Sequence, residues 1–236
     1  MKVDLYYETE MADQCYRFSE FCAVHEIKTT GDIPDKRALY LSREGLALKT
    51  PGFAKPLYIK NRPEALKPFK TNLVRACLPK DRLILDEYTI LDGFSGFGGD
   101  ALTLAMTRCR LTLVEKDPLV WLMLRELTEG IPNIQLNCRD CMELMEKDSR
   151  DWDTIYLDPM FHRNRKSALP NLELQHLRAL STDEPIDFQS LIELSRSKAK
   201  RRVVIKRKLK DPIWLKPNFS IEGKLVRFDV YHGAAA

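Results

Sequence analysis

The sequence predicts an α/β fold, a parallel and doubly wound sheet, with a small α+β appendage before it. Three observations support this prediction. Short apolar runs alternate with helix-forming segments from residue 89 to residue 205, a pattern typical of parallel sheets joined through helices. A glycine-rich loop follows the first of these runs. Residues 1–60 lack the alternation, so we expect an α+β subdomain there and the sheet domain at residues 61–236.

The composition is that of an ordinary globular protein. The chain has 236 residues, of which 44% are hydrophobic and 31% are charged. No apolar stretch has the length of a signal-peptide core or a membrane span, so we expect a cytoplasmic protein with no membrane partner. Its six cysteines are then expected to be reduced. Cys138-x-x-Cys141 has no second such pair and no nearby histidine pair, so no metal site is expected.

The first part of the chain is expected to contain short elements. We expect a strand over residues 3–7, a helix over residues 13–24, and a hairpin of residues 39–41 and 46–48 around the turn sequence Ser-Arg-Glu-Gly. Apolar residues at three- and four-residue steps predict a further helix over residues 63–78.

The alternating region supplies the sheet and its connecting helices. Strands are expected at residues 90–91, 110–114, 134–136, 154–157 and 202–205. Helices are expected at residues 101–106, 118–129, 142–147 and 188–196, and a hairpin at 219–221 and 225–231. Such a sheet binds its ligand at the carboxyl ends of its strands, so that edge is where we expect the functional site.

The loop after the first strand of this region has the composition of a cofactor-binding turn. It contains Gly93, Gly96, Gly98 and Gly99. Glycine lets backbone N–H groups approach a ligand closely, because no side chain intervenes. A loop that only turns the chain is the plain alternative.

Two cofactors fit the loop. Gly96-x-Gly98-x-x-Ala101, with Glu115 downstream, matches the dinucleotide fingerprint formally. Asp92, however, ends the strand directly before the glycines. A carboxylate there repels a pyrophosphate but suits the ammonium and sulfonium groups of S-adenosylmethionine. The loop therefore favours the methyl donor over NAD.

Acidic residues follow four successive expected strands: Asp92, Glu115, Asp140 and Asp158. Glu115 is placed to accept hydrogen bonds from both ribose hydroxyls of a nucleoside. Asp140 and Cys141 are expected to border the adenine, with a helix N-cap as the alternative role of Asp140. Asp100, at the start of the next helix, either contacts the amino-acid end of the cofactor or acts only as a cap.

Asp158-Pro159-Met160-Phe161 is the most discriminating motif. An exocyclic base amine is a poor nucleophile because its lone pair is delocalised into the ring. Asp158 and a neighbouring carbonyl can accept its two N–H bonds and stabilise the positive charge that develops during methylation. Phe161 is expected to stack on the base. A plain turn after a strand is the alternative interpretation.

Basic residues follow this motif. Arg163, Arg165 and Lys166 are expected to contact RNA phosphates, and a second basic run spans residues 198–210. We expect both runs near the mouth of the site, although a solvated basic surface is the alternative. His162 is not needed as a base, because a methylated amine releases its proton readily to water.

Five segments are similar to motifs of a known family: Asp-Gly-Phe-Ser-Gly-Phe-Gly-Gly-Asp, Leu-Val-Glu-Lys-Asp-Pro, Tyr-Leu-Asp-Pro-Met-Phe, Lys-Ser-Ala-Leu and Arg-Phe-Asp-Val-Tyr. On these segments, residues 60–233 resemble the small-subunit ribosomal RNA guanine-N2 methyltransferase J family. The segment around Asp158, with its spaced Lys-Ser-Ala, is more specific than the glycine loop. The first 60 residues match poorly.

The resemblance implies a Rossmann-like, class I S-adenosylmethionine-dependent methyltransferase fold. It implies S-adenosylmethionine as cofactor and a guanine of 16S ribosomal RNA, naked or in the 30S particle, as acceptor. It places cofactor contacts at Gly99, Asp100, Glu115, Lys116, Asp140, Cys141 and Asp158. Two other functions stay open: methylation of another exocyclic amine, such as adenine N6 in RNA or DNA, and RNA binding by a non-catalytic ribosome-assembly factor. A dehydrogenase is the most distant alternative.

Overall fold

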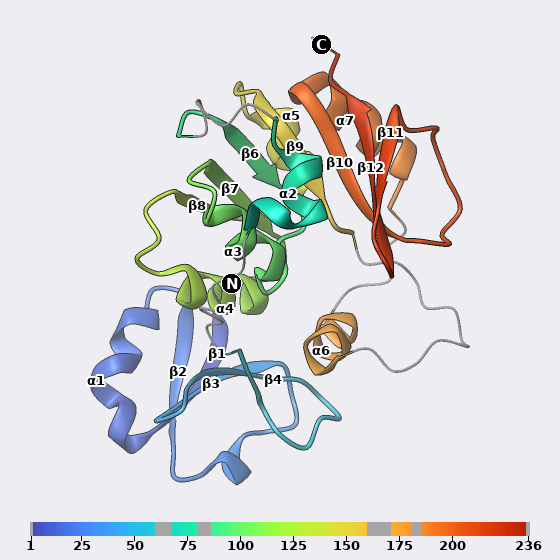
Figure 1. The fold of residues 1–236 in the computed structure, drawn as a ribbon. Coiled ribbons are helices and arrows are strands. Elements are labelled where there is room, and N and C mark those ends of the chain that lie inside the picture. Colours follow the sequence, from blue (N-terminus) through green and yellow to red (C-terminus); the bar gives the residue numbers. More distant parts are fainter. Residues whose placement is uncertain (1, 60–67, 80–85, 160–170, 181–185, 235–236) are drawn as a thin grey trace. The chain divides into compact units, whose positions relative to one another are not determined.

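The computed structural model describes residues 2–59, 68–79, 86–159, 171–180 and 186–234 (Figure 1). Contacts divide the chain into two units. The first unit comprises Met1–Arg62, Asp117–Glu129 and His162–Thr182, and the second comprises Pro63–Lys116, Gly130–Phe161 and Asp183–Ala236. Two later segments thus join the N-terminal unit. The division into an N-terminal subdomain at residues 1–60 and a sheet domain at residues 61–236 stays a prediction.

The first unit is built on a five-stranded sheet in the order β2-β1-β3-β4-β5. Its strands are β1 (Val3–Glu8), β2 (Cys22–Ile27), β3 (Ala38–Ser42), β4 (Gly45–Lys49) and β5 (Leu57–Tyr58). The expected first strand and the hairpin of β3 and β4 are confirmed. Tyr6, Ala38, Tyr40 and Ala47 form part of its buried core.

The expected helix over residues 13–24 is wrong. Only α1 (Ala12–Cys15) and a 3₁₀ turn (Tyr16–Phe18) are helical, and the chain then enters β2. Strand β2 pairs in parallel with β1 over six residues, from Val3 opposite Cys22 to Glu8 opposite Ile27. This pairing satisfies the backbone groups of β2 through a distant partner, which a local helical pattern does not reveal. Further 3₁₀ turns cover Thr9–Met11 and Thr30–Asp32.

Two helices also belong to the first unit. The expected helix α4 (Pro118–Thr128) is confirmed; Asp117 caps it by accepting hydrogen bonds from the N–H groups of Leu119 and Val120. Helix α6 (Leu172–Leu180) was not predicted. It carries the buried His176, whose Nδ1 lies 2.8 Å from Oγ1 of Thr50.

The second unit contains a seven-stranded sheet in the order β11-β12-β10-β9-β6-β7-β8. Its strands are β6 (Thr89–Asp92), β7 (Arg110–Glu115), β8 (Ile134–Cys138), β9 (Trp152–Leu157), β10 (Ala199–Lys208), β11 (Phe219–Glu222) and β12 (Val226–His232). Strands β6 to β10 are parallel, and the expected terminal hairpin adds β12 and β11 antiparallel to them. The predicted α/β fold is confirmed. The order of strands reverses between β6 and β9, which is where such sheets bind ligands.

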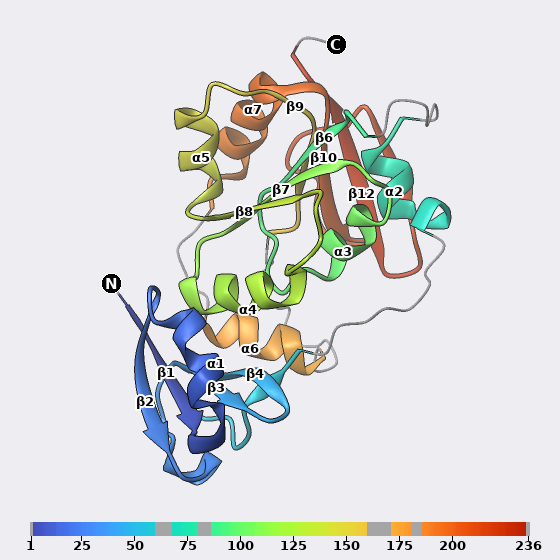
Figure 2. The ribbon, with the colours of Figure 1, turned by 90° about the vertical axis from the view of Figure 1, so that its left-hand side faces the viewer.

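Helices cover both faces of this sheet. Helices α5 (Cys141–Lys147) and α7 (Phe188–Lys198) lie together on one face, and α2 (Asn72–Cys77) and α3 (Gly99–Ala105) lie on the other (Figure 2). The helix expected over residues 63–78 is shorter than predicted. A 3₁₀ turn (Pro68–Lys70) precedes Thr71, whose extended backbone and side-chain hydrogen bond to the N–H of Val74 start α2. Residues 63–67 lie outside the described part of the chain.

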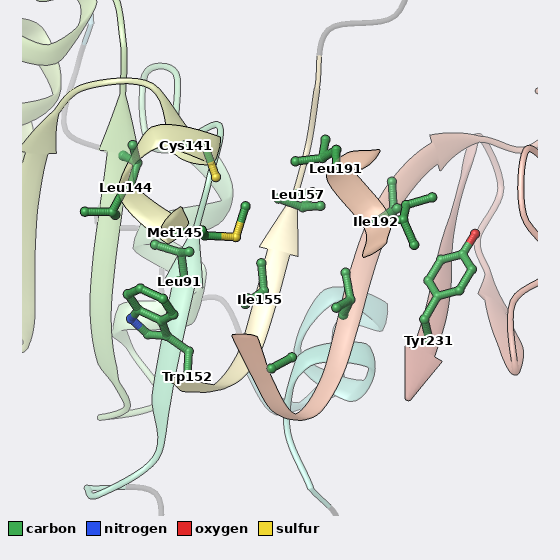
Figure 3. Close-up of a cluster of buried hydrophobic side chains, with 14 residues drawn as sticks. Leu91, Cys141, Leu144, Met145, Trp152, Ile155, Leu157, Leu191, Ile192 and Tyr231 are labelled. Carbon is green, nitrogen blue, oxygen red and sulfur yellow. The ribbon is translucent and has the colours of Figure 1, made fainter. Parts of the chain in front are cut away.

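The main core lies between this sheet and the pair α5 and α7. Figure 3 shows Leu144 and Met145 of α5 beside Leu91 of β6 and Ile155 of β9, with Ile192 of α7 beyond them. Burial of these side chains fixes the strands against the helices, and therefore fixes the strand ends that carry the acidic residues. Within the described residues, no helix is long and apolar enough to span a membrane.

Candidate cofactor and acceptor site

The loop between β6 and α3 is held by hydrogen bonds of Ser95 to the ends of β6 and β7. Ser95 donates its N–H to the carbonyl of Val114 at 3.0 Å, and its hydroxyl donates to the carbonyl of Asp92 at 3.1 Å. The same hydroxyl accepts from the N–H of Val114 at 3.2 Å. Gly98 caps α3 with φ of 79°, a left-handed conformation that favours glycine. The loop therefore presents the N-terminus of α3 at the carboxyl edge of the sheet.

Gly93 is required for packing beneath this loop. A Cβ atom at this position would lie 2.4 Å from Sγ of Cys141 and 2.9 Å from Cδ2 of Leu157. By contrast, no atom lies within 4 Å of a Cβ atom built at Gly99. Gly93 thus brings the β6 end against α5, while Gly99 faces open space.

We expect Gly93→Ala to lower the free energy of unfolding by about 1–3 kcal/mol, because the added methyl group overpacks a buried contact. Urea unfolding measures the effect. The double variant with Cys141→Ala removes the nearest clash and is expected to recover part of the loss. Gly99→Ala is the control and should stay within about 0.5 kcal/mol of the parent. Equal stability of Gly93→Ala and the parent would contradict this packing.

Four acidic residues occupy the carboxyl edge, as their positions after the strands predicted. Asp92 ends β6, Glu115 ends β7, Asp140 lies two residues after β8, and Asp158 directly follows β9. Strands β9, β6, β7 and β8 are neighbours in that order, so these four residues share one edge. Asp100 joins them from the first turn of α3.

Asp100 and Asp158 are joined by a lysine that sequence reasoning missed. Nζ of Lys206, on β10, donates to Oδ2 of Asp100 at 2.6 Å and to Oδ2 of Asp158 at 2.9 Å. The hydroxyl of Tyr156 donates to the same oxygen of Asp100 at 2.5 Å. In the sequence Lys206 is one of many cations in the run at residues 198–210, and only the pairing of β10 with β9 brings it to this edge.

Burial and repulsion from neighbouring carboxylates raise the pKa values of Asp92 and Asp158. Asp92 is 1% exposed, and its burial, with the carboxylates of Asp100 and Asp158, holds its pKa well above the ordinary value. Burial likewise raises the pKa of Asp158 to about 6, although the ammonium group of Lys206 opposes the shift. Three carboxylates thus face one ammonium group. An additional cation at this edge would relieve the repulsion, which fits a ligand carrying sulfonium and ammonium groups.

Glu115 is oriented by the glycine loop. Its Oε2 accepts the N–H of Gly96 at 3.0 Å. Gly96 itself has φ of 51°, another left-handed position. Lys116 follows Glu115 and is exposed at the same strand end. A carboxylate fixed in this way is suited to accept hydrogen bonds from vicinal hydroxyls.

Asp140 and Cys141 differ in their surroundings. Asp140 caps α5, with Oδ1 accepting from the N–H groups of Met142 at 2.8 Å and Glu143 at 3.2 Å. Its Oδ2 makes no hydrogen bond with any described part of the chain, so the cap leaves one carboxylate oxygen for a ligand. Cys141 is 3% exposed and packs in the core, where burial raises the pKa of its thiol. Contact of Cys141 with an adenine stays a prediction.

Only the second half of the basic run at residues 198–210, from Lys206 onward, lies at the carboxyl edge where the site was expected. Strand β10 runs parallel to β9, so Lys198, Lys200 and Arg201 lie at the opposite edge of the sheet. About 20 Å of strand separates Lys200 from Lys206. Arg207 is 1% exposed and lies over the ring of Trp214. The predicted residues Phe161, Arg163, Arg165 and Lys166 lie outside the described residues.

Comparison with known proteins assigns the family. Residues 57–233 match the family model described as "Putative SAM-dependent methyltransferase". A Nitrosococcus oceani protein named "Ribosomal RNA small subunit methyltransferase J" is 33% identical over 220 residues, covering 82% of this chain and 83% of that protein. The chain belongs to this SAM-dependent methyltransferase family.

Other members align over shorter stretches. Proteins of the same printed name from Magnetococcus marinus and Coxiella burnetii are 34% and 38% identical, over 155 and 153 residues. Each alignment covers 61% of this chain, and they cover 61% and 60% of the two relatives, so the chain spans less than two thirds of their length.

A solved structure supports the fold. The SAM-dependent methyltransferase of Neisseria gonorrhoeae superposes with a TM-score of 0.68 at 21% identity, covering 99% of this chain and 97% of that one. The class I methyltransferase fold is therefore confirmed, and S-adenosylmethionine is the cofactor of the family. The excess of carboxylates at the sheet edge fits this positively charged cofactor.

Proposed function

We propose that this SAM-dependent methyltransferase methylates the exocyclic N2 of a guanine in 16S ribosomal RNA. The observation that carries the proposal is the placement of Asp158, at the acceptor motif, beside the acidic edge suited to the cofactor. The names of the relatives, which specify ribosomal RNA of the small subunit, support the choice of substrate. We place the reaction in the cytoplasm, with naked RNA or the 30S particle as the acceptor.

Each proposed cofactor contact follows from the chemistry of its side chain. Asp92 and Asp100 would face the cationic amino-acid end, together with the loop glycines Gly96, Gly98 and Gly99. Glu115 would accept from the ribose hydroxyls, with Lys116 beside it. Asp140 and Cys141 would border the adenine.

Bound S-adenosylmethionine supplies an electrophilic methyl carbon; when the amine nitrogen bonds to it, the carbon–sulfur electrons remain on sulfur and S-adenosylhomocysteine is released. Asp158 orients the amine by accepting an N–H and stabilises the charge that develops on nitrogen. Phe161 would stack on the guanine. The surplus proton of the methylated amine passes to water. A guanine within a structured region must first be extruded from its stack.

Nucleoside mass spectrometry tests this proposal. Naked 16S RNA and 30S particles lacking the modification are incubated with isotope-labelled donor, digested and analysed. Labelled N2-methylguanosine is the expected product. Labelled N6-methyladenosine would show that adenine, and not guanine, is the acceptor. RNA binding without any labelled nucleoside would indicate a non-catalytic binding protein.

The basic segment after the acceptor motif is expected to bind phosphates. We expect replacement of Arg163, Arg165 and Lys166 by alanine to reduce the slope of log affinity against log salt by about 2–3, because each cation that pairs with a phosphate releases roughly one counterion. Filter binding at several salt concentrations measures the slope. Lys200→Ala, at the opposite edge of the sheet, is the control and should leave the slope unchanged. An unchanged slope in the triple variant would remove these residues from the RNA interface.

A further inference from the structure

Lys206 is a partly buried lysine at the carboxyl end of β10, where two carboxylates pair with it. It follows the buried residues Val203, Val204 and Ile205 on β10, and its side chain is 25% exposed. Ile205 pairs with Leu157 of β9, so Lys206 comes level with Asp158. Its ammonium group bridges Oδ2 of Asp158 and Oδ2 of Asp100, at 2.9 and 2.6 Å. One cation thereby connects the end of β9 with the first turn of α3.

We propose that Lys206 is a positioning residue for methyl transfer: it ties the acceptor-side carboxylate of Asp158 to the cofactor-side carboxylate of Asp100 and keeps Asp158 ionised. Because Lys206 engages Oδ2 of Asp158, the other oxygen, Oδ1, is left to accept the amine N–H. This inference rests on the proposed function and extends it to a residue that touches neither the base nor the methyl group.

The charges around Asp158 explain why a cation is needed there. Asp92 on β6, Asp100 on α3 and the phenol of Tyr156 on β9 face this region, and Lys206 on β10 supplies the positive charge. Burial opposes the charge of Lys206, but Asp158 and Asp100 together raise its pKa above the ordinary value. Without Lys206, burial and two carboxylates would all favour protonation of Asp158. A protonated Asp158 presents an O–H donor and is a poor acceptor for an amine.

A titration of the cofactor-free protein tests the inference without any substrate. Carboxyl carbon NMR, with Asp158→Asn to assign the signal, follows Asp158 in the parent and in Lys206→Met. We expect the Asp158 signal to titrate at a pH about 1–3 higher in Lys206→Met, the size of shift that an adjacent opposite charge produces. Lys200→Met, on the same strand at the far edge, is the control and should titrate as the parent. Equal midpoints in the parent and Lys206→Met would overturn the inference.

The pH dependence of transfer gives a second, independent readout. Transfer requires ionised Asp158, so the rate falls as pH drops through the pKa of Asp158. Loss of Lys206 raises that pKa, so the fall in rate on the acidic side of the pH–rate profile occurs at higher pH. We expect Lys206→Met to lose about 2- to 100-fold in kcat at pH 7, to approach the parent as pH rises, and to be largely rescued in Lys206→Arg.

If Lys206 had a purely structural role, Lys206→Met would lower thermal stability without shifting the acidic side of the pH–rate profile. An unshifted profile would overturn the inference. Absence of transfer by the parent enzyme would instead refute the proposed function. The titration decides the role of Lys206 in either case, because it needs neither RNA nor cofactor.

Discussion

Replacing Asp158 by alanine is expected to lower kcat for methyl transfer by about 10²–10⁴-fold, the range seen when a residue that orients or stabilises the reacting group is removed. Asp158 directly follows β9, at the point where the strand order reverses. Alanine there provides no acceptor for the amine N–H. S-adenosylhomocysteine should still bind, at least partly, because the other acids of the edge remain. Single-turnover assays and calorimetry separate the two effects.

Asp158→Ala is a suitable test because Lys206 still has Asp100 as an ion-pair partner in this variant. Nζ of Lys206 also donates to Asp100 at 2.6 Å, and we expect this contact to remain when Asp158 is replaced. Asp151→Ala, an exposed acid before β9, is the matched control and should retain parental turnover. Near-parental turnover in Asp158→Ala would remove this carboxylate from the mechanism.

Glu115→Ala is expected to weaken S-adenosylhomocysteine binding by roughly 100-fold or more. Two hydrogen bonds to a carboxylate contribute about 1.5–3 kcal/mol each, and alanine removes both. The variant also loses the 3.0 Å hydrogen bond that Glu115 accepts from Gly96, so part of the effect reflects a less ordered loop. Isothermal titration calorimetry measures the dissociation constant.

A matched pair of controls identifies the cause of that loss. Glu115→Gln keeps one acceptor oxygen and should fall between the parent and Glu115→Ala. Glu146→Ala removes an exposed acid of α5 and should bind as the parent does. If Glu115→Ala bound the cofactor product with parental affinity, the ribose would have to lie elsewhere.

The gathering of acidic residues at the carboxyl edge of the sheet could be predicted from the sequence, because it follows from the order of the strands and acids along the chain. Asp92, Glu115 and Asp158 come at or directly after apolar runs, and parallel strands bring such positions together. The partner of two of these acids could not be predicted in this way. Lys206 lies far along the chain among other cations, and only the pairing of β10 with β9 distinguishes it from Lys200.

Two wrong expectations, one in each unit, have a similar origin. Cys22–Ile27 forms a strand because β1 is available beside it, although the local pattern suggested a helix. The run at residues 198–210 was interpreted as a surface because charge was counted along the chain, whereas strand direction places its two ends at opposite edges. Pairing and direction are tertiary properties that local composition does not contain.

A crystal structure with S-adenosylhomocysteine bound tests the central claim most directly. We expect the ligand at the carboxyl edge of β6 and β7, with its ribose hydroxyls on Glu115 and its amino-acid end beside Asp92 and Asp100. The sulfur atom should point toward Asp158. A ligand bound at another edge of the sheet, without contact to these carboxylates, would contradict the account.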